Sequence, residues 1–364
     1  MNNTLDTIQL GFLTIYPYGL CVAGGALLGF VYLFFRELKG HLNKGTASWL
    51  AVLGIPLAVL FGRLGYVLAC LDWFKSEGMG KALQMTDGGF LFYGALAGLL
   101  LAGWITARIT KQKAGRVMDS MAVPSALLIA AARMGEPLVG AGVGRSIEFW
   151  LDPWNELVFF TSEDPSALYR FPFAVQDYYG EWCFGVFFIE AVVAVIIAVI
   201  LMLWRTKRPG TKALIFPALY AATQAALEAM RFDAVLKLGW VKFNNVDISF
   251  AKFKDLSFVK VNQLLALPIL LAIITIAIVR IPRGKRSWWI PVYGYGTVLL
   301  QCGVIVAMEF AMDEKIKILQ WMKIDLIFIV MALAAFIMSV STCRVLHISD
   351  IRGPLTPEEK PPAE

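Results

Sequence analysis

Charged and polar side chains interrupt several long apolar stretches of this 364-residue chain. A charge at the centre of a lipid bilayer costs about 2.5–3.5 kcal/mol on insertion scales, so each such residue calls for a reason. Two sets show helical spacing, namely Arg133 with Glu136, and the stripe Tyr220, Gln224, Glu228 and Arg231. Residues three and four apart share one face of a helix. Each set is therefore predicted to form a polar face directed at another helix or at a watery cavity.

Basic side chains in these stretches fall at a similar predicted depth: Arg63, Arg133, Arg145 and Arg231. Arginine is suited to phosphate because its planar guanidinium can donate two parallel hydrogen bonds to phosphate oxygens. Glycine-rich segments at 87–89 and 140–144 border the same region and allow close approach of the backbone to a headgroup. The pattern predicts a binding site for the anionic headgroup of a lipid.

Acidic residues accompany the arginines. A glutamate in such a site can take up a proton, which makes Glu136, one turn from Arg133, the first candidate for a general base and Glu228 the second. The alternative is a set of interhelical salt bridges that only specify packing. For Glu190 we favour a packing role in which it pairs with Arg63.

The composition indicates an integral membrane protein. The chain is 58% hydrophobic and only 16% charged, whereas soluble domains have about 25% charged residues. Stretches of about 20 apolar residues match the length of a membrane-spanning helix. We predict an all-α polytopic fold with about nine transmembrane helices, at roughly 12–35, 47–70, 88–110, 117–143, 183–204, 212–231, 262–280, 289–309 and 324–343.

Four connecting loops are strongly basic and alternate with loops that are mixed or acidic. The basic loops hold fifteen Lys and Arg residues against the single acid Glu37. The positive-inside rule therefore predicts an external N-terminus and a cytoplasmic C-terminus, with the polar cluster in the outer half of the membrane. These loops account for the net charge of +6, so we predict no nucleic-acid partner.

The longer segments outside the spans differ in character. Residues 144–182 are rich in aromatic side chains and are predicted to form a small external cap, while residues 232–260 alternate like a strand and are predicted to form an external arm. The end of the chain, residues 346–364, is rich in Pro and Glu and is predicted to be a disordered cytoplasmic tail.

A series of short motifs occurs in a specific order along the chain: Tyr18-Gly-Leu, Gly62-Arg-Leu-Gly-Tyr66, Asp87-Gly-Gly, Arg133-Met-Gly-Glu136 reaching Gly144-Arg145, the stripe from Tyr220 to Arg231, and Asn262-Gln263. In these motifs the chain resembles the bacterial prolipoprotein diacylglyceryl transferases. Members of that family are integral membrane enzymes that move the diacylglyceryl group of phosphatidylglycerol onto a lipobox cysteine thiol. The resemblance implies a seven-span core at 1–280, two additional helices at 281–345 and a location in the bacterial cytoplasmic membrane.

Several positions that the resemblance marks as functional have changed type. Tyr93 stands where the family has a histidine, Glu136 where it has an asparagine, and Gln224 where it has an arginine. The residues that retain the family's types are Tyr18, Arg133, Gly144, Tyr220, Glu228 and Arg231. The chain's two histidines, His41 and His347, are predicted on the cytoplasmic side, so neither can replace the missing one.

Two functional hypotheses follow. In the first, the chain is an active transferase in which Glu136, Glu228 or Tyr93 serves catalysis. The lipid-binding set is then Arg133, Arg231, Arg63, Arg145, Gly144, Tyr18, Tyr220 and Gln224. In the second, the chain is a non-catalytic relative that binds anionic lipid or a lipoprotein segment as a partner subunit.

The expected partners are phosphatidylglycerol or another anionic phospholipid and the signal peptide of a prelipoprotein. A protein partner could bind through the two additional helices at 281–345. We predict neither a cofactor nor a metal site, because the five cysteines occur singly and no CxxC is present.

Overall fold

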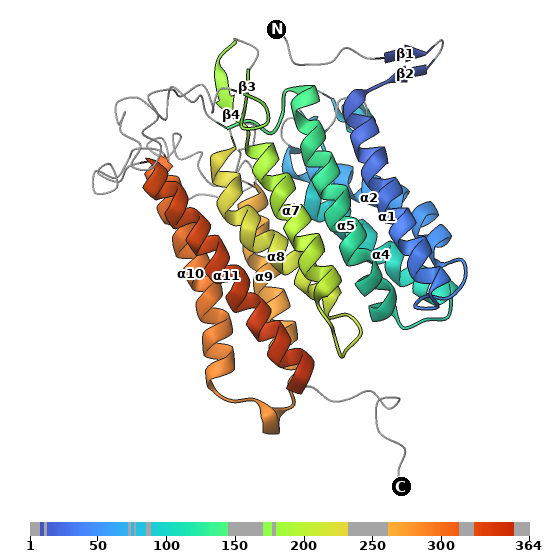
Figure 1. Ribbon diagram of the computed structural model, residues 1–364, viewed down its shortest axis with the longest axis vertical. Coiled ribbons are helices and arrows are strands. Elements are labelled where there is room, and N and C mark those ends of the chain that lie inside the picture. The colour runs from blue at the N-terminus through green and yellow to red at the C-terminus, as the bar shows by residue number, and fades with distance from the viewer. Residues whose placement is uncertain are drawn as a thin grey trace.

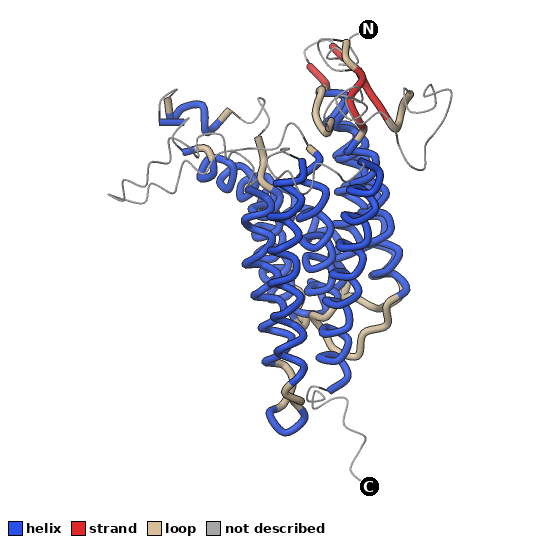
Figure 2. The backbone as a smooth tube through the Cα atoms, turned by 90° about the vertical axis from the view of Figure 1, so that its left-hand side faces the viewer, coloured by secondary structure: helices blue, strands red, loops and turns tan. Residues whose placement is uncertain are grey.

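The computed structural model describes residues 8–10, 13–71, 74–75, 78–84, 89–144, 170–176, 180–231, 261–312 and 324–352. Nine α-helices lie within these residues: α1 (Pro17–Leu38), α2 (Thr46–Ala69), α4 (Phe92–Ile109), α5 (Ala114–Gly135), α7 (Val186–Leu203), α8 (Lys212–Leu227), α9 (Val261–Val279), α10 (Trp289–Met312) and α11 (Ile324–Arg352). They run alternately up and down in one bundle (Figures 1 and 2). The prediction of an all-α polytopic membrane protein is confirmed.

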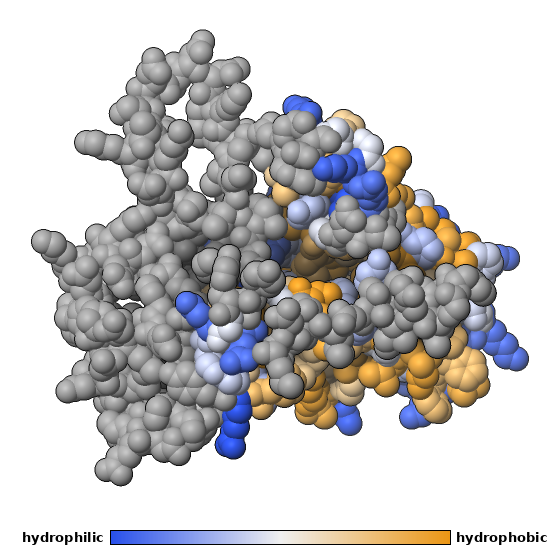
Figure 3. All heavy atoms as spheres, turned by 90° about the horizontal axis from the view of Figure 1, so that it is seen from above, coloured by the Kyte–Doolittle hydropathy of each residue, from blue (hydrophilic) through white to orange (hydrophobic). Residues whose placement is uncertain are grey.

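Six helices in the described part of the chain are long and apolar enough to cross a membrane. They are α1, α2, α4, α5 with its continuation to Val139, α7 and the Ala332–Arg352 part of α11. Large apolar side chains such as Leu203 and Phe336 are exposed on the flanks, and the side visible in Figure 3 carries many hydrophobic residues. The finer count of nine spans remains a prediction.

The helices form two groups that meet at α5. On one side α1 packs against α5 and α2 packs against α4, where Gly94 and Gly98 bring two backbones together. A methyl group at Gly98 would collide with the Leu57 carbonyl oxygen, so only glycine permits this crossing. On the other side α7, α8, α9, α10 and α11 share a core that includes Ile274, Ile290 and Leu346. The two additional helices are thus packed onto α8 and α9.

Helix α8 carries most of the polar stripe, and its start is held by acids from other helices. It has only 16 residues and contains Pro217, which cannot donate a backbone hydrogen bond. The Asp119 carboxylate of α5 accepts from the backbone N–H groups of Gly210 at 2.7 Å and Ala213 at 2.9 Å. These bonds satisfy amides that a helix N-terminus leaves without partners.

The predicted start of the disordered tail at residue 346 is wrong. Helix α11 continues to Arg352, and Asp350 is buried against the turn that precedes α8. Its carboxylate accepts from the backbone N–H groups of Lys207 at 2.9 Å and Arg208 at 3.0 Å, and from the Thr211 hydroxyl at 2.9 Å. These tertiary hydrogen bonds hold the last turns of the helix, and residues 353–364 lie outside the described part.

The described strands lie at the upper end in Figure 1. Strand β1 (Ile8–Leu10) pairs antiparallel with β2 (Leu13–Ile15), and β3 (Ala174–Gln176) with β4 (Trp182–Phe184). Strand β3 lies in the predicted cap at 144–182 and β4 begins at its last residue, while residues 145–169 and 177–179 of the cap are outside the described set. The predicted arm at 232–260 also lies outside it.

Candidate functional site

Arg133 is at the centre of a polar cluster at the upper end of the bundle. It lies in the last turn of α5, and its side chain is only 13% exposed. Its Nη1 lies 2.5 Å from Oε1 of Glu136, and its Nε lies 3.3 Å from Oε2 of Glu190 on α7. Its Nη2 donates to the Tyr220 hydroxyl of α8 at 3.1 Å. One guanidinium therefore connects three helices.

Arg231, which follows α8, pairs with the same two carboxylates. Its Nη1 lies 2.6 Å from Oε2 of Glu190 and 3.0 Å from Oε2 of Glu136. Each glutamate thus bridges two guanidinium groups. The arrangement brings together Arg133, Glu136 and Arg231, the last member of the 220–231 stripe. The two polar faces predicted from the sequence are therefore directed at each other.

The predicted stripe is one helix face only in part. Helix α8 ends at Leu227, Glu228 opens a short 3-10 helix (Glu228–Met230), and Arg231 is extended. Likewise α5 ends at Gly135, and Glu136 opens the 3-10 helix Glu136–Val139, whose second residue is Pro137. The expectation of continuous helices through Glu136 and Arg231 is wrong. The turns nevertheless aim both residues into one cluster.

Gly144 fixes the backbone beside Arg231. It forms an isolated antiparallel bridge with Arg231, and its N–H donates to the Phe184 carbonyl oxygen at 2.7 Å. A methyl group at Gly144 would lie 3.0 Å from the Met230 carbonyl oxygen and 3.1 Å from Cγ2 of Val186. The lack of a side chain therefore lets this segment pass between neighbouring backbones and hold Arg231 in place.

Glu228 and Asn262 form the next part of the cluster, towards α9. The Asn262 amide donates to Oε1 of Glu228 at 2.9 Å, and the Gln263 amide donates to the Ala225 carbonyl oxygen at 3.1 Å. Asn262 was not among the predicted site residues, although it stands in the Asn262-Gln263 motif. Adjacent amides at the start of an apolar span were the signal that could have identified them.

Aromatic rings line the side of the cluster nearest α4. The Tyr93 ring meets the Tyr220 ring edge to face at 6.5 Å, and the Phe92 ring centre lies 4.0 Å from that of Tyr220. Tyr18 of α1 reaches the end of α5, where a methyl group at Gly135 would lie 3.2 Å from its Cδ2 atom. The three candidate tyrosines therefore border the same end of the bundle.

Buried polar atoms without partners gather around this cluster. Within the described residues these include the Tyr93 hydroxyl, Oε1 of Gln224, Oδ1 of Asn262 and Oε1 of Glu190. Buried polar groups are normally hydrogen-bonded. Oxygen atoms dominate this set and can accept hydrogen bonds, so they suit water or a ligand that carries donors such as hydroxyl groups.

Arg63 has a different role from the one expected. Its guanidinium donates to the backbone carbonyl oxygens of Lys81, Ala82, Gln84 and Gly89 at 2.8–3.1 Å. These bonds hold the segment between α2 and α4 and account for the burial of the charge. The expected pairing of Arg63 with Glu190 is wrong, because Glu190 pairs with Arg133 and Arg231 instead. Arg145 and Asp87 lie outside the described residues.

The cluster carries more acid than base among the described residues. Arg133 and Arg231 oppose Glu136, Glu190 and Glu228, which leaves a formal charge of −1 when all five are ionised. Any phosphate that enters must therefore compete with carboxylates that already neutralise both arginines.

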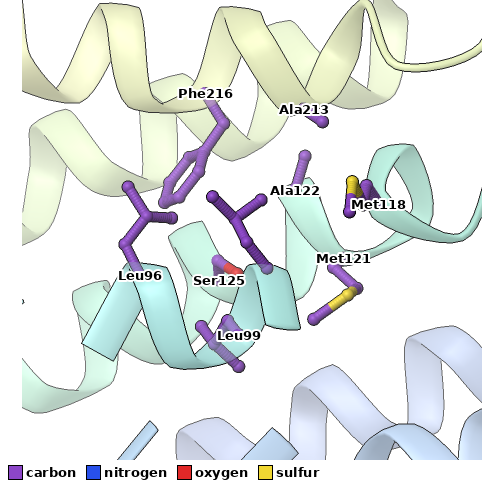
Figure 4. Close-up of a pocket in the computed structure, with 9 residues that line it drawn as sticks. Leu96, Leu99, Met118, Met121, Ala122, Ser125, Ala213 and Phe216 are labelled. Carbon is purple, nitrogen blue, oxygen red and sulfur yellow. The ribbon is translucent and has the colours of Figure 1, made fainter. Parts of the chain in front are cut away.

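An apolar cavity of about 20 Å³ lies between α4, α5 and α8 (Figure 4). Leu96, Met121, Ser125 and Phe216 are among the side chains that line it. The Phe216 ring centre lies 6.4 Å from that of Tyr220, which places the cavity below the polar cluster. Its size suits a water-sized group, so an acyl chain would need these helices to separate.

Comparison of the sequence with known proteins identifies a family. The family model for prolipoprotein diacylglyceryl transferase matches residues 6–279. The chain belongs to that family. This prolipoprotein diacylglyceryl transferase family member extends beyond the match by α10 and α11, which pack on its α8 and α9.

Individual relatives support the same assignment, and all three carry the name phosphatidylglycerol–prolipoprotein diacylglyceryl transferase. The relative from Halalkalibacterium halodurans is 27% identical over 236 residues, covering 63% of this chain and 76% of the relative. The one from Bacillus licheniformis is 34% identical over 135 residues, covering 35% and 48%. The one from Clostridioides difficile is 23% identical over 222 residues, covering 60% and 79%.

Proposed function

We propose that this protein binds phosphatidylglycerol and transfers its diacylglyceryl group to the cysteine thiol of a prolipoprotein. The observation that carries the proposal is the convergence of Arg133 and Arg231, from different elements, on one buried site. Two guanidinium groups held so close together suit a phosphate and the charge that develops on it as it leaves. Membership of the transferase family supports the same reaction.

The reaction assigns clear roles to the site. The thiol sulfur attacks the glycerol carbon that carries the phosphate, a carbon–sulfur bond forms, and the carbon–oxygen bond to phosphate breaks. Glycerol phosphate leaves with the electron pair, and the thiol proton passes to a base. Thiolate is the reacting form, and a free cysteine with a pKa near 8.5 is mostly protonated at neutral pH, so this base is needed.

Arg133 retains donors for a phosphate. A guanidinium has five N–H groups. Among the described residues, Arg133 donates one from Nη1 to Glu136 and one from Nη2 to Tyr220, while its Nε forms an ion pair with Glu190. One N–H on each terminal nitrogen remains to meet phosphate oxygens, while the two glutamates hold the guanidinium plane in place.

Glu228 is the base we favour over Glu136. Glu136 is the counter-ion of both arginines, and a carboxylate in that position cannot take a proton without leaving two buried charges less compensated. Glu228 accepts a hydrogen bond from the neutral amide of Asn262. Tyr93 lies beside Tyr220, and its hydroxyl has no hydrogen-bond partner among the described residues, so it could supply a polar contact.

We also propose that the cluster faces the outside of the bacterial cytoplasmic membrane. The loops at the lower end in Figure 1 carry the basic residues, which favour the cytoplasmic side. A prelipoprotein cysteine would then be presented at the upper end. Helices α10 and α11 pack against α8 and α9 within the chain. A protein partner that binds these two helices remains a prediction.

The test is a turnover assay in nanodiscs. Purified protein receives phosphatidylglycerol labelled in its headgroup together with a lipobox peptide, and released glycerol phosphate is counted. Release that requires the peptide supports the transferase. A peptide with serine in place of the lipobox cysteine is the control and should give none. Retained lipid without any release would instead favour the non-catalytic lipid-binding alternative.

A further inference from the structure

A second charged cluster lies at the opposite, lower end of α8. Arg208 lies in the turn before α8, Lys212 is the first residue of α8, and Arg280 follows the last residue of α9. Asp119 and Asp350 are the acids that face it from α5 and α11. The 16 residues of α8 separate this cluster from the upper site by about 24 Å. The two are therefore distinct places in the fold.

The two acids of the lower cluster are committed to the backbone. Both oxygens of Asp119 accept from amides of α8 or its preceding turn. Both oxygens of Asp350 likewise accept, from the N–H groups of Lys207 and Arg208 and from the Thr211 hydroxyl. Neither acid forms an ion pair with Arg208 or Arg280 in the described part of the structure.

Arg208 is a buried cation with two guanidinium nitrogens that lack a partner among the described residues. The residue is 8% exposed, and its Nε and Nη2 atoms are enclosed without a hydrogen-bond partner among the described residues. Buried charged groups are otherwise paired or hydrogen-bonded, because a guanidinium removed from water loses its solvation. What completes this group must be a hydrogen-bond acceptor, and its charge favours an anion.

Arg280 brings a second guanidinium to the same turn. Its Nη2 lies 3.2 Å from the place a Cβ would take on Gly210, which has a φ of +86° and stands two residues after Arg208. Burial lowers the pKa of Arg280, and the nearby charge of Arg208 lowers it further, whereas Asp119 and Asp350 act in the opposite sense. Two like charges this close are stabilised by an anion placed between them.

We propose that Arg208 and Arg280 bind a phosphate group, carried by an anionic phospholipid of the leaflet at this end or by free phosphate. Arg208 and Arg280 lie where a lipid headgroup is expected, at the end of the apolar surface. Leu203 is 76% exposed and Val279 is 66% exposed, so the lipid-facing surfaces of α7 and α9 end just before the two arginines. Each guanidinium can donate two parallel hydrogen bonds to phosphate oxygens. This site is independent of the transferase reaction.

The test compares arginine-to-glutamine variants in nanodiscs of phosphatidylcholine with a small fraction of phosphatidylglycerol. Native mass spectrometry counts the phosphatidylglycerol that stays on the released protein. Arg208→Gln/Arg280→Gln should weaken this retention by about tenfold, the scale of lost charge-assisted hydrogen bonds. Arg283→Gln, which removes a charge from an exposed residue in the adjacent loop, should leave it unchanged. If the double variant does not fold, the single variant Arg280→Gln, at a half-buried residue, should also weaken the retention of phosphatidylglycerol.

A second arm separates the two sources of phosphate. Inorganic phosphate is titrated into protein in nanodiscs of phosphatidylcholine alone, and the melting temperature is followed. Stabilisation that is lost in Arg280→Gln assigns the site to free phosphate, whereas lipid retention without such stabilisation assigns it to a headgroup. If the folded variants keep both phosphatidylglycerol and the phosphate response at the level of Arg283→Gln, the proposal is overturned.

Discussion

The Nη1 atom of Arg231 lies 2.6 Å from Oε2 of Glu190, which joins the segment after α8 to the buried interior of α7. The same oxygen lies 3.3 Å from Nε of Arg133. Glu190 is 1% exposed and is thus the innermost link between the two arginines. Its position explains why a single acid is present in a helix that is otherwise free of charge.

Glu190→Gln should destabilise the protein through this link. The change leaves Arg133 and Arg231 with less compensating charge in a buried place, and removal of one partner of a buried pair costs about 3–5 kcal/mol. We expect a clear drop in the melting temperature in detergent. Arg283→Gln, at an exposed residue in the loop before α10, is the control and should melt like wild type. Equal melting of the two variants would show that the ion pairs at Glu190 contribute little.

Arg133→Ala should abolish tight binding of phosphatidylglycerol at the upper site. The variant loses the donors that face the proposed phosphate and leaves Glu136 and Glu190 with Arg231 alone. Native mass spectrometry of the folded variant measures the bound lipid. Arg170→Ala removes an exposed charge at the same end and serves as control. Full retention by Arg133→Ala would place the headgroup elsewhere.

Asp350→Asn should loosen the start of α8. The substitution removes the negative charge that two backbone N–H groups and the Thr211 hydroxyl share, at a cost of about 1–3 kcal/mol. Hydrogen exchange should become faster at the amides of Lys207 and Arg208. Ser339→Ala breaks only a bond within α11 and should leave this exchange unchanged. Slow exchange in both variants would contradict a capping role for Asp350.

Tyr93→His tests whether the residue at this position limits turnover. A histidine there would place a base with a pKa near neutrality next to Tyr220. We expect turnover at pH 7 to rise by about tenfold, less than the roughly 10²–10⁴-fold that a general base typically contributes, because Glu228 already serves as the proposed base. Tyr93→Phe, which removes only the hydroxyl, is the matched control. If wild type shows no turnover while Tyr93→His with Gln224→Arg gains it, the natural chain binds lipid without catalysis.

The sequence predicted the helices well and their partners poorly. Apolar length alone locates spans such as α2 and α7, because a bilayer requires it. Spacing places Arg133 and Glu136 together, yet it says nothing of which helix faces them, so Glu190 was matched with Arg63 at the same depth. Asp350 was assigned to a disordered tail because its hydrogen-bond partners lie about 140 residues earlier in the chain.

Substitution of Glu228 and of Glu136 tests which of the two glutamates is the general base. Glu228→Gln should cut turnover by about 10²–10⁴-fold with lipid binding intact, which is the usual size of a lost general base. Glu136→Gln removes a carboxylate that competes with phosphate, so it should bind phosphatidylglycerol at least as tightly and lose less turnover. Rates from the same nanodisc assay check both. A larger loss of turnover in Glu136→Gln than in Glu228→Gln would instead identify Glu136 as the base.

The mass of the lipobox peptide after incubation with protein and phosphatidylglycerol tests the transferase account most directly. The account predicts a gain of one diacylglyceryl group on the cysteine sulfur with wild type, little gain with Glu228→Gln, and none with a serine peptide. An unmodified cysteine peptide, with wild type folded and phosphatidylglycerol bound, would contradict it.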